Sequence, residues 1–181
     1  EVQSTTVITT GLLNANLASE ASLVDAGLSQ EIAAKITSER PFLTIESFVE
    51  VLGDSIDLET VFAKVFVPLN INETEEETFK LIPGVGDRMA HEFEEYKPYV
   101  NLNQFRKEIG KYVDEQEVAR LEQYIFVPVE LNTAQEEDIK NVPGVGAKMT
   151  HDFFEYRSYE NMSQVNKEIG KYVDEAELSR L

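Results

Sequence analysis

The chain contains no cysteine and no long apolar run, and each absence excludes a class of protein. Without cysteine there is no thiol nucleophile, no thiolate metal site and no disulfide. No apolar run approaches the ~20 residues that a membrane-spanning helix needs, so we expect no membrane span.

Signatures of catalysis and of nucleotide binding are also missing. The Gly-x-Gly pieces lack the strand, the third glycine and the P-loop lysine that nucleotide motifs require. Carboxylate runs such as Glu75–Glu77 are expected in so acidic a chain and are usually solvated faces. We therefore predict that the protein is not an enzyme and has neither catalytic residues nor a cofactor.

Basic residues are scarce. The chain has 16 Lys and Arg against 34 Asp and Glu, a net charge of −18, divided as −7 for residues 1–66, −6 for 67–126 and −5 for 127–181. Nucleic-acid affinity comes largely from Lys and Arg that displace counterions from phosphates, so DNA should repel this chain at low salt. Contact with DNA would have to be local. The acidity also suits solubility or the recruitment of a basic partner.

The sequence does contain a repeat. Residues 67–121 align without a gap with residues 127–181, with 30 identities in 55 positions and a period of 60 residues. We predict three domains: a divergent unit at 1–66, a clear unit at 67–126, and a clear unit at 127–181 that stops before any counterpart of Glu122–Phe126. Because so small a unit buries little surface alone, the units should pack into a continuous helical array.

Each clear unit carries a Pro-Gly-Val-Gly turn, at Pro83–Gly86 and at Pro143–Gly146, between two helical patterns. We interpret these turns as the hairpins of helix-hairpin-helix units, because glycine allows positive φ and a close backbone approach. Thr133 and Glu136 predict a capping box that opens a first helix ending near Val142. The helix after each turn has one apolar face, formed by Val85, Met89, Phe93 and Tyr96 and by Val145, Met149, Phe153 and Tyr156.

The first amides of the helix after each turn lack partners within the helix and carry the positive end of its dipole, so phosphate can bind there. The predicted main phosphate site consists of Gly144, Val145, Gly146 and Lys148. A weaker site consists of Gly84, Gly86 and Arg88. It is weaker because Asp87 already complements the dipole and would repel a phosphate. The alternative is that both turns are only tight connections between helices.

The two histidines, His91 and His151, occupy the same repeat position on a polar helix face. One histidine per unit cannot supply the ligands that zinc usually takes, even beside Glu92 or Asp152, so we expect exposed histidines and no metal site. Aromatic side chains at helical spacing are expected in the core, among them Phe93, Tyr96, Tyr99 and Tyr112.

Residues 1–66 match the repeat imperfectly. Leu13-Asn14 stands where Leu69-Asn70 does, and Gly27-Leu28-Ser29 falls at the hairpin, with Ser29 in place of the second glycine. Two further matches are Pro41-Phe42 with Pro98-Tyr99 and Leu52-Gly53 with Ile109-Gly110.

Four pieces of the third unit are Leu131-Asn132-Thr133-Ala134, Glu137-Asp138-Ile139, Val142-Pro143-Gly144-Val145-Gly146 and Glu155-Tyr156-Arg157. With these pieces the unit resembles the helix-hairpin-helix domain of ComEA-type competence proteins. That domain is a pair of hairpins, and the second here would be the Glu168-Ile169-Gly170 turn leading into Asp174–Leu181. The second unit matches through Leu69-Asn70, Ile82–Gly86 and Glu95-Tyr96-Lys97.

The resemblance implies an all-α fold of tandem helix-hairpin-helix repeats, with two clear units and one divergent N-terminal unit. It also implies binding of double-stranded DNA without sequence preference, and a periplasmic or secreted location. A sequence that begins at Glu1 without Met fits either a cleaved signal peptide or a trimmed chain.

A second hypothesis remains open. The protein would be an acidic scaffold or an accessory subunit of a larger extracytoplasmic complex, binding a protein partner with a basic surface, and its hairpins would be purely structural. The extrinsic helix-hairpin-helix subunit of photosystem II, which the chain resembles only loosely, is of this kind.

Overall fold

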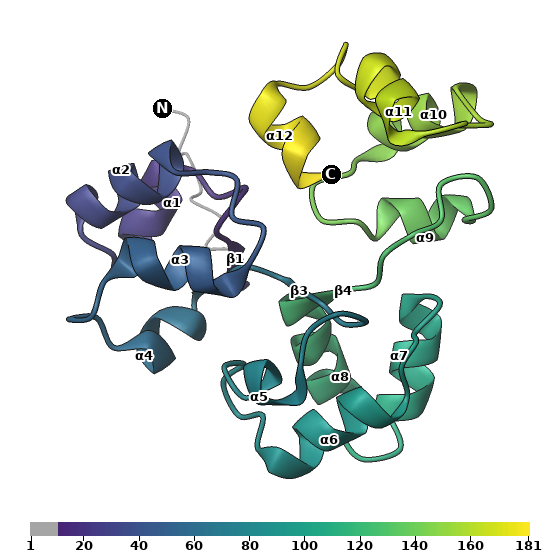
Figure 1. Cartoon of the computed structure of the whole chain (residues 1–181). Helices are drawn as coiled ribbons and strands as arrows, with labels where there is room; N and C mark the ends of the chain where they lie inside the picture. The colour runs from purple at the N-terminus through teal and green to yellow at the C-terminus, as the bar shows by residue number, and fades with distance from the viewer. Residues whose placement is uncertain (1–10) are drawn as a thin grey trace, which may run out of the picture.

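A computed structural model describes residues 11–181, so the part of the expected first unit before Gly11 lies outside the described residues (Figure 1). Within this range the chain forms twelve α-helices, one short 3-10 helix and four two-residue strands. The prediction of a mostly helical protein is confirmed. None of the helices in residues 11–181 is long and apolar enough to cross a membrane.

The elements follow the sequence repeat, and we use the repeat to name three segments. The first segment (residues 11–66) contains β1 (Leu13–Asn14), α1 (Glu20–Asp25), α2 (Gln30–Ser38), α3 (Ile45–Leu52), α4 (Leu58–Phe62) and β2 (Val65–Phe66). The second (67–126) contains β3 (Leu69–Asn70), α5 (Glu76–Phe79), α6 (Asp87–Glu95), α7 (Leu102–Ile109), α8 (Glu115–Leu121), η1 (Glu122–Tyr124) and β4 (Ile125–Phe126). The third (127–181) contains α9 (Glu136–Lys140), α10 (Ala147–Glu155), α11 (Met162–Ile169) and α12 (Glu175–Arg180).

The short strands were not expected from the sequence. β1 pairs in parallel with β2, and β3 pairs in parallel with β4, so the start and end of each of these two segments are joined by backbone hydrogen bonds. Val129 and Glu130 occupy the corresponding place in the third segment and form no strand.

Side-chain caps explain where several helices begin. Asn101 and Asn161 are the N-caps of α7 and α11, and the side chain of each accepts a hydrogen bond from the amide three residues later.

The predicted capping box of Thr133 and Glu136 is wrong. The Thr133 amide donates to the carbonyl of Glu130 in a turn, α9 begins only at Glu136, and the Gln135 amide donates to the Asp138 carboxylate at 3.2 Å.

In each segment, one asparagine side chain joins the beginning of the segment to the backbone of an aromatic residue 26 or 27 positions later. The side chains of Asn16, Asn72 and Asn132 each bond to both the amide and the carbonyl of one aromatic residue, with distances between 2.7 and 2.9 Å. These aromatic residues are Phe42, Tyr99 and Tyr159. The counterpart of Leu131-Asn132 is therefore Ile71-Asn72 rather than Leu69-Asn70, which instead matches Leu13-Asn14 as a strand.

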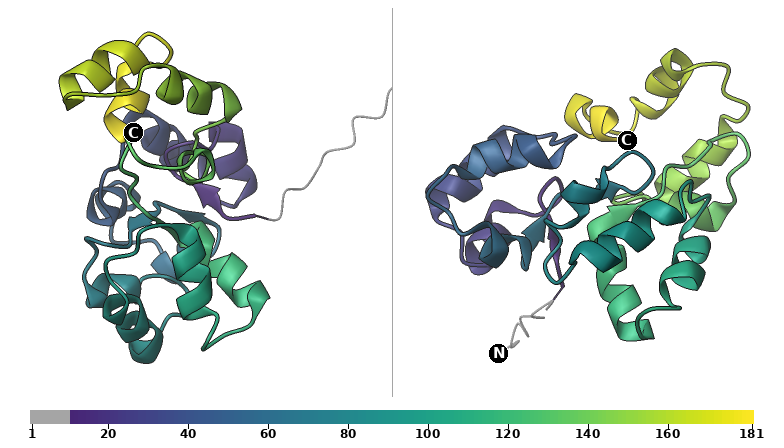
Figure 2. Two further views of the ribbon diagram at one scale, coloured as in Figure 1. Left: turned by 90° about the vertical axis from the view of Figure 1, so that its right-hand side faces the viewer. Right: turned by 60° about the horizontal axis from the view of Figure 1, so that its bottom comes forward.

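The buried side chains form two clusters. One extends from Ala15 to Val127 and joins the first two segments, with Phe66 packed edge-on against Tyr124 at 4.9 Å between ring centroids. The other, from Ile139 to Ile169, belongs to the third segment alone. In Figures 1 and 2 the helices of the three segments form three groups, and the third lies at one end of the molecule. The first two segments thus share a core, to which the third segment contributes only its first residue, Val127.

Candidate nucleic-acid interface

The two Pro-Gly-Val-Gly turns have the same backbone conformation. Gly84 and Gly144 have φ values of 82° and 84°, in the left-handed region that favours glycine. Gly86 and Gly146 are extended instead, with φ values of −99° and −88°, and each is the N-cap of the following helix. Only the first glycine of each turn therefore uses positive φ, whereas the second leaves the start of the helix without a side chain.

The helix starts after these turns have no side-chain cap. Neither Gly86 nor Gly146 can accept a hydrogen bond from the first turn of α6 or α10 through a side chain, and both glycines are exposed. The first segment differs, although Gly27 also has positive φ, at 103°. There Ser29 is the N-cap, and its hydroxyl accepts from the Ile32 amide at 3.2 Å. Among the three helices that follow these turns, only α6 and α10 thus begin without a side-chain cap.

The structure separates the predicted phosphate-site residues into two kinds. Val145 is buried and anchors its turn, as Val85 does in the other turn. The exposed residues are Gly84, Gly86, Arg88, Gly144, Gly146 and Lys148. Arg88 lies 5.8 Å from the centroid of the Tyr112 ring, and Lys148 lies 5.9 Å from that of Tyr172. Each basic side chain therefore rests on a tyrosine beside its helix start.

The helix starts of α6 and α10 differ in charge. Asp87 lies in the first turn of α6 and forms an ion pair with Lys80 at 2.7 Å, and the hydrogen bond from Lys80 holds the pKa of Asp87 below its usual value. In α10 this position is Ala147, and Lys140 pairs with Glu136 instead. The open amides of α10 therefore face no carboxylate from their own first turn.

An arginine near each turn was not found from the sequence. A β-carbon placed on Gly84 would lie 3.4 Å from Nη2 of Arg120, and one on Gly144 would lie 2.8 Å from Nη2 of Arg180. Each guanidinium is held by two hydrogen bonds of 2.6 to 2.7 Å to the glutamate three residues earlier in the chain. The sequence did contain a sign of these arginines, because Arg120 and Arg180 occupy the same repeat position.

Three other basic side chains serve to hold the fold. Arg40, Lys97 and Arg157 lie at one repeat position and each donates to a backbone carbonyl beyond the asparagine of its own segment. The acceptors are Ala18, Thr74 and Ala134. Lys97 and Arg157 belong to the sequence pieces that carry the family resemblance. In this fold their side chains are hydrogen-bonded to backbone carbonyls of their own segment.

The histidines are exposed, as predicted, and His91 Nδ1 lies 3.5 Å from Glu76 Oε2. Glu92 and Asp152 are buried, so neither shares an exposed helix face with the histidine beside it. Among residues 11–181 no three His, Asp or Glu side chains are grouped so that they could hold a metal ion.

The aromatic residues are of two kinds. Phe93 and Tyr99 are buried, as expected, and burial raises the pKa of Tyr99. Tyr96 is half-buried and packs against the core. The expectation that Tyr112 is a core residue is wrong, because it is half-buried outside the core, and its hydroxyl bonds to that of Tyr96 at 2.8 Å. Tyr156 and Tyr172 form the same pair, which raises the pKa of Tyr172 to about 12.

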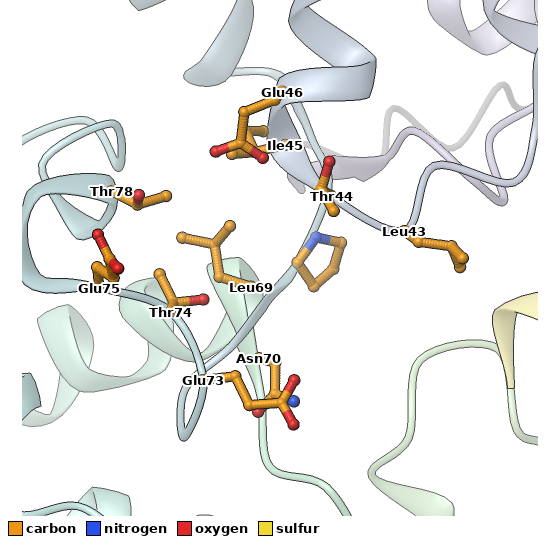
Figure 3. Close-up of a pocket in the computed structure, with 11 residues that line it drawn as sticks. Leu43, Thr44, Ile45, Glu46, Leu69, Asn70, Glu73, Thr74, Glu75 and Thr78 are labelled. Carbon is orange, nitrogen blue, oxygen red and sulfur yellow. The ribbon is translucent and has the colours of Figure 1, made fainter.

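An acidic cavity of about 300 Å³ lies between the first two segments (Figure 3). Its wall includes Glu46 of α3 together with Glu73 and Glu75 beside α5, and none of its lining residues is basic. The three carboxylates make this cavity suited to a cationic group.

Comparison of the chain with protein-family models, with curated proteins and with solved structures finds no match.

Proposed function

We propose that the chain is a non-enzymatic array of three helix-hairpin-helix units, divided near residues 66 and 126, that binds double-stranded DNA without sequence preference. Phosphates would bind the open amides at the starts of α6 and α10. The observation that carries this proposal is that both helices begin at an exposed glycine with no side-chain cap, while a basic residue follows two positions later. A helix start of this kind binds anions through its amides and its dipole.

The negative charge of the chain requires that contact to be local. Lys148 and Arg88 are exposed beside the open amides, and Arg180 and Arg120 lie behind the turns. In Figure 1, α6 and α10 lie at opposite ends of the molecule, so each turn would contact its own phosphates. We place this activity outside the cytoplasm, in the periplasm or among secreted proteins, as in the competence proteins that the third unit resembles.

The first test installs a cap without changing charge. In Gly86→Ser and Gly146→Ser the new hydroxyl should occupy the first-turn amides, as the Ser29 hydroxyl does in α2. Nothing lies within 4 Å of a β-carbon at either glycine, so the fold should be retained. We expect the double variant to bind a labelled DNA duplex more weakly than the native chain in a fluorescence anisotropy titration at low salt with magnesium.

The control for this test is the melting temperature, which should be unchanged or slightly higher, because serine is at least as good an N-cap as glycine. A double variant that binds DNA as tightly as the native chain would show that the amides are not the phosphate site.

The second candidate function is docking of a protein partner with a basic surface, and the acidic cavity favours it. A Lys or Arg side chain could enter beside Glu46, Glu73 and Glu75. Replacing these three with Gln should abolish crosslinking to such a partner in the native source, whereas Gly86→Ser and Gly146→Ser should leave it intact.

A further inference from the structure

One carboxylate is buried at the same position of α6 and α10. Glu92 is 9% exposed and Asp152 is 5% exposed. One oxygen of each, Oε2 of Glu92 and Oδ2 of Asp152, has no hydrogen-bond partner among the described residues. A buried charge without a partner is costly, and native proteins usually pair such groups. The Tyr112 hydroxyl lies beside the Glu92 carboxylate, and hydrogen bonding to Tyr96 and Glu92 raises the pKa of Tyr112. Oε2 of Glu92 and Oδ2 of Asp152 can each still accept a further bond.

The first segment carries the opposite charge at this position. Helices α2, α6 and α10 each contain nine residues that follow the hairpin, and Lys35 of α2 corresponds to Glu92 and Asp152. Nζ of Lys35 lies 3.4 Å from the carbonyl oxygen of Val51, one of the last carbonyls of α3. Such carbonyls lack partners within their own helix. In the first segment the side chain at this position is thus an exposed lysine, whose ammonium group lies at the end of α3.

A cavity adjoins Glu92 in the second segment. Its volume is about 410 Å³, and its wall consists of Met89, Glu92, Tyr112, Val113 and the start of α6 at 86–88. The third segment has the same kinds of residue at the corresponding positions, namely Met149, Asp152, Tyr172 and Val173. A carboxylate beside a tyrosine ring attracts an ammonium group through both charge and the ring face.

The rings of these tyrosines already attract cations. Arg88 lies over Tyr112 and Lys148 lies over Tyr172, yet neither basic group is bonded to the buried carboxylate of its own helix. We propose that Glu92 and Asp152 each bind a primary ammonium group on an alkyl chain, where the first segment has a lysine of its own. This inference does not depend on DNA binding. The ammonium group would come from a diamine or from the lysine side chain of a partner.

The tyrosines provide the signal for a test. The chain has no tryptophan, so its ultraviolet fluorescence comes from tyrosines, and Tyr112 and Tyr172 adjoin the two carboxylates. The full chain is titrated at constant ionic strength with 1,4-diaminobutane and with N-acetyl-lysine amide, and with tetramethylammonium as a cation that lacks N–H donors. We expect saturable binding of at least one of the first two compounds and none of tetramethylammonium. Binding of the diamine alone identifies a free polyamine as the source, and binding of the lysine amide identifies a protein side chain.

Variants separate the proposed sites from the general negative charge. Glu92→Gln with Asp152→Asn should weaken binding about tenfold or more, because each removes a charged hydrogen-bond acceptor. The matched control is Glu95→Gln with Glu155→Gln, which removes the same charge from exposed positions of the same helices and should leave binding unchanged. Equal losses in the two double variants, or no loss in the first, would overturn the proposal.

Two further measurements keep the test decisive if the double variant folds poorly. The single variants Glu92→Gln and Asp152→Asn should each lose one binding site and keep the other. Glu92→Lys with Asp152→Lys copies the arrangement of Lys35, so we expect a helical, cooperatively melting chain that no longer binds the ligand. A folded lysine variant that still binds as the native chain does would contradict the proposal.

Discussion

At the scale of single residues, the two proposed phosphate sites differ at one position, Asp87 against Ala147. Asp87 places a carboxylate in the first turn of α6, where Lys80 offsets part of its charge. Ala147 leaves the first turn of α10 open. A phosphate should therefore bind the start of α10 more tightly than the start of α6.

Charge reversal at the basic residues tests this ranking. We expect Lys148→Glu to weaken DNA binding more than Arg88→Glu, because Lys148 assists the more open site. Each lost phosphate contact should reduce the slope of log K against log salt by about one unit. The measurement is an anisotropy titration at several salt concentrations. Equal effects of the two substitutions, or a preference for one DNA sequence, would contradict the ranking.

The sequence predicted that Arg88 and Lys148 lie beside the helix starts, because each follows the second glycine of its turn by two residues. It did not predict Arg120 or Lys80 beside the turn of the second segment. These residues reach the turn only through the packing of α8 and of the α5–α6 connection, which local periodicity does not contain. The expectation for Tyr112 was wrong because that residue lies in the turn before α8, where helical spacing does not apply.

At the scale of elements, each Pro-Gly-Val-Gly turn depends on the positive φ of its first glycine. Gly84→Ala should lower the free energy of unfolding by about 1–2 kcal/mol, because alanine resists the left-handed region. In a chain of this size that corresponds to roughly 2–8 °C in Tm.

The control for this substitution is Gly86→Ser, two residues away, where the backbone is extended and a β-carbon has free space. Its Tm should not fall. Thermal melting followed by circular dichroism measures both, and a Gly84→Ala variant that melts like the native chain would show that the turn tolerates a side chain.

Helix positions were predictable at this scale, and the strands were not. β1 to β4 have two residues each, too short for an alternating pattern to be visible, and their pairing joins the two ends of a segment. The start of α9 was misplaced because Thr133 and Glu136 have the spacing of a capping box. Instead, the Thr133 amide donates to the carbonyl of Glu130, so that Thr133 belongs to a turn and does not cap the helix.

At the scale of the whole molecule, the shared core joins the first two segments and leaves the third with a cluster of its own. A fragment of residues 1–126 should therefore fold and melt cooperatively, since Phe66 and Tyr124 remain packed together. Circular dichroism of this fragment gives the test. A non-cooperative melt, or an unfolded fragment, would show that the third segment is needed for the core.

The net charge of −18 opposes DNA binding by the whole molecule, whatever the amides contribute locally. We therefore expect affinity in the range of non-specific contacts, a Kd of about 10⁻⁶ to 10⁻⁴ M at physiological salt. Magnesium should strengthen binding, because divalent ions screen the acidic faces.

The most direct measurement is a titration of a labelled DNA duplex with the native chain at low salt, with and without magnesium. We expect saturable binding that magnesium strengthens, that added monovalent salt weakens and that does not change with the DNA sequence. If no binding occurs at low salt with magnesium present, the open amides of α6 and α10 are not phosphate sites.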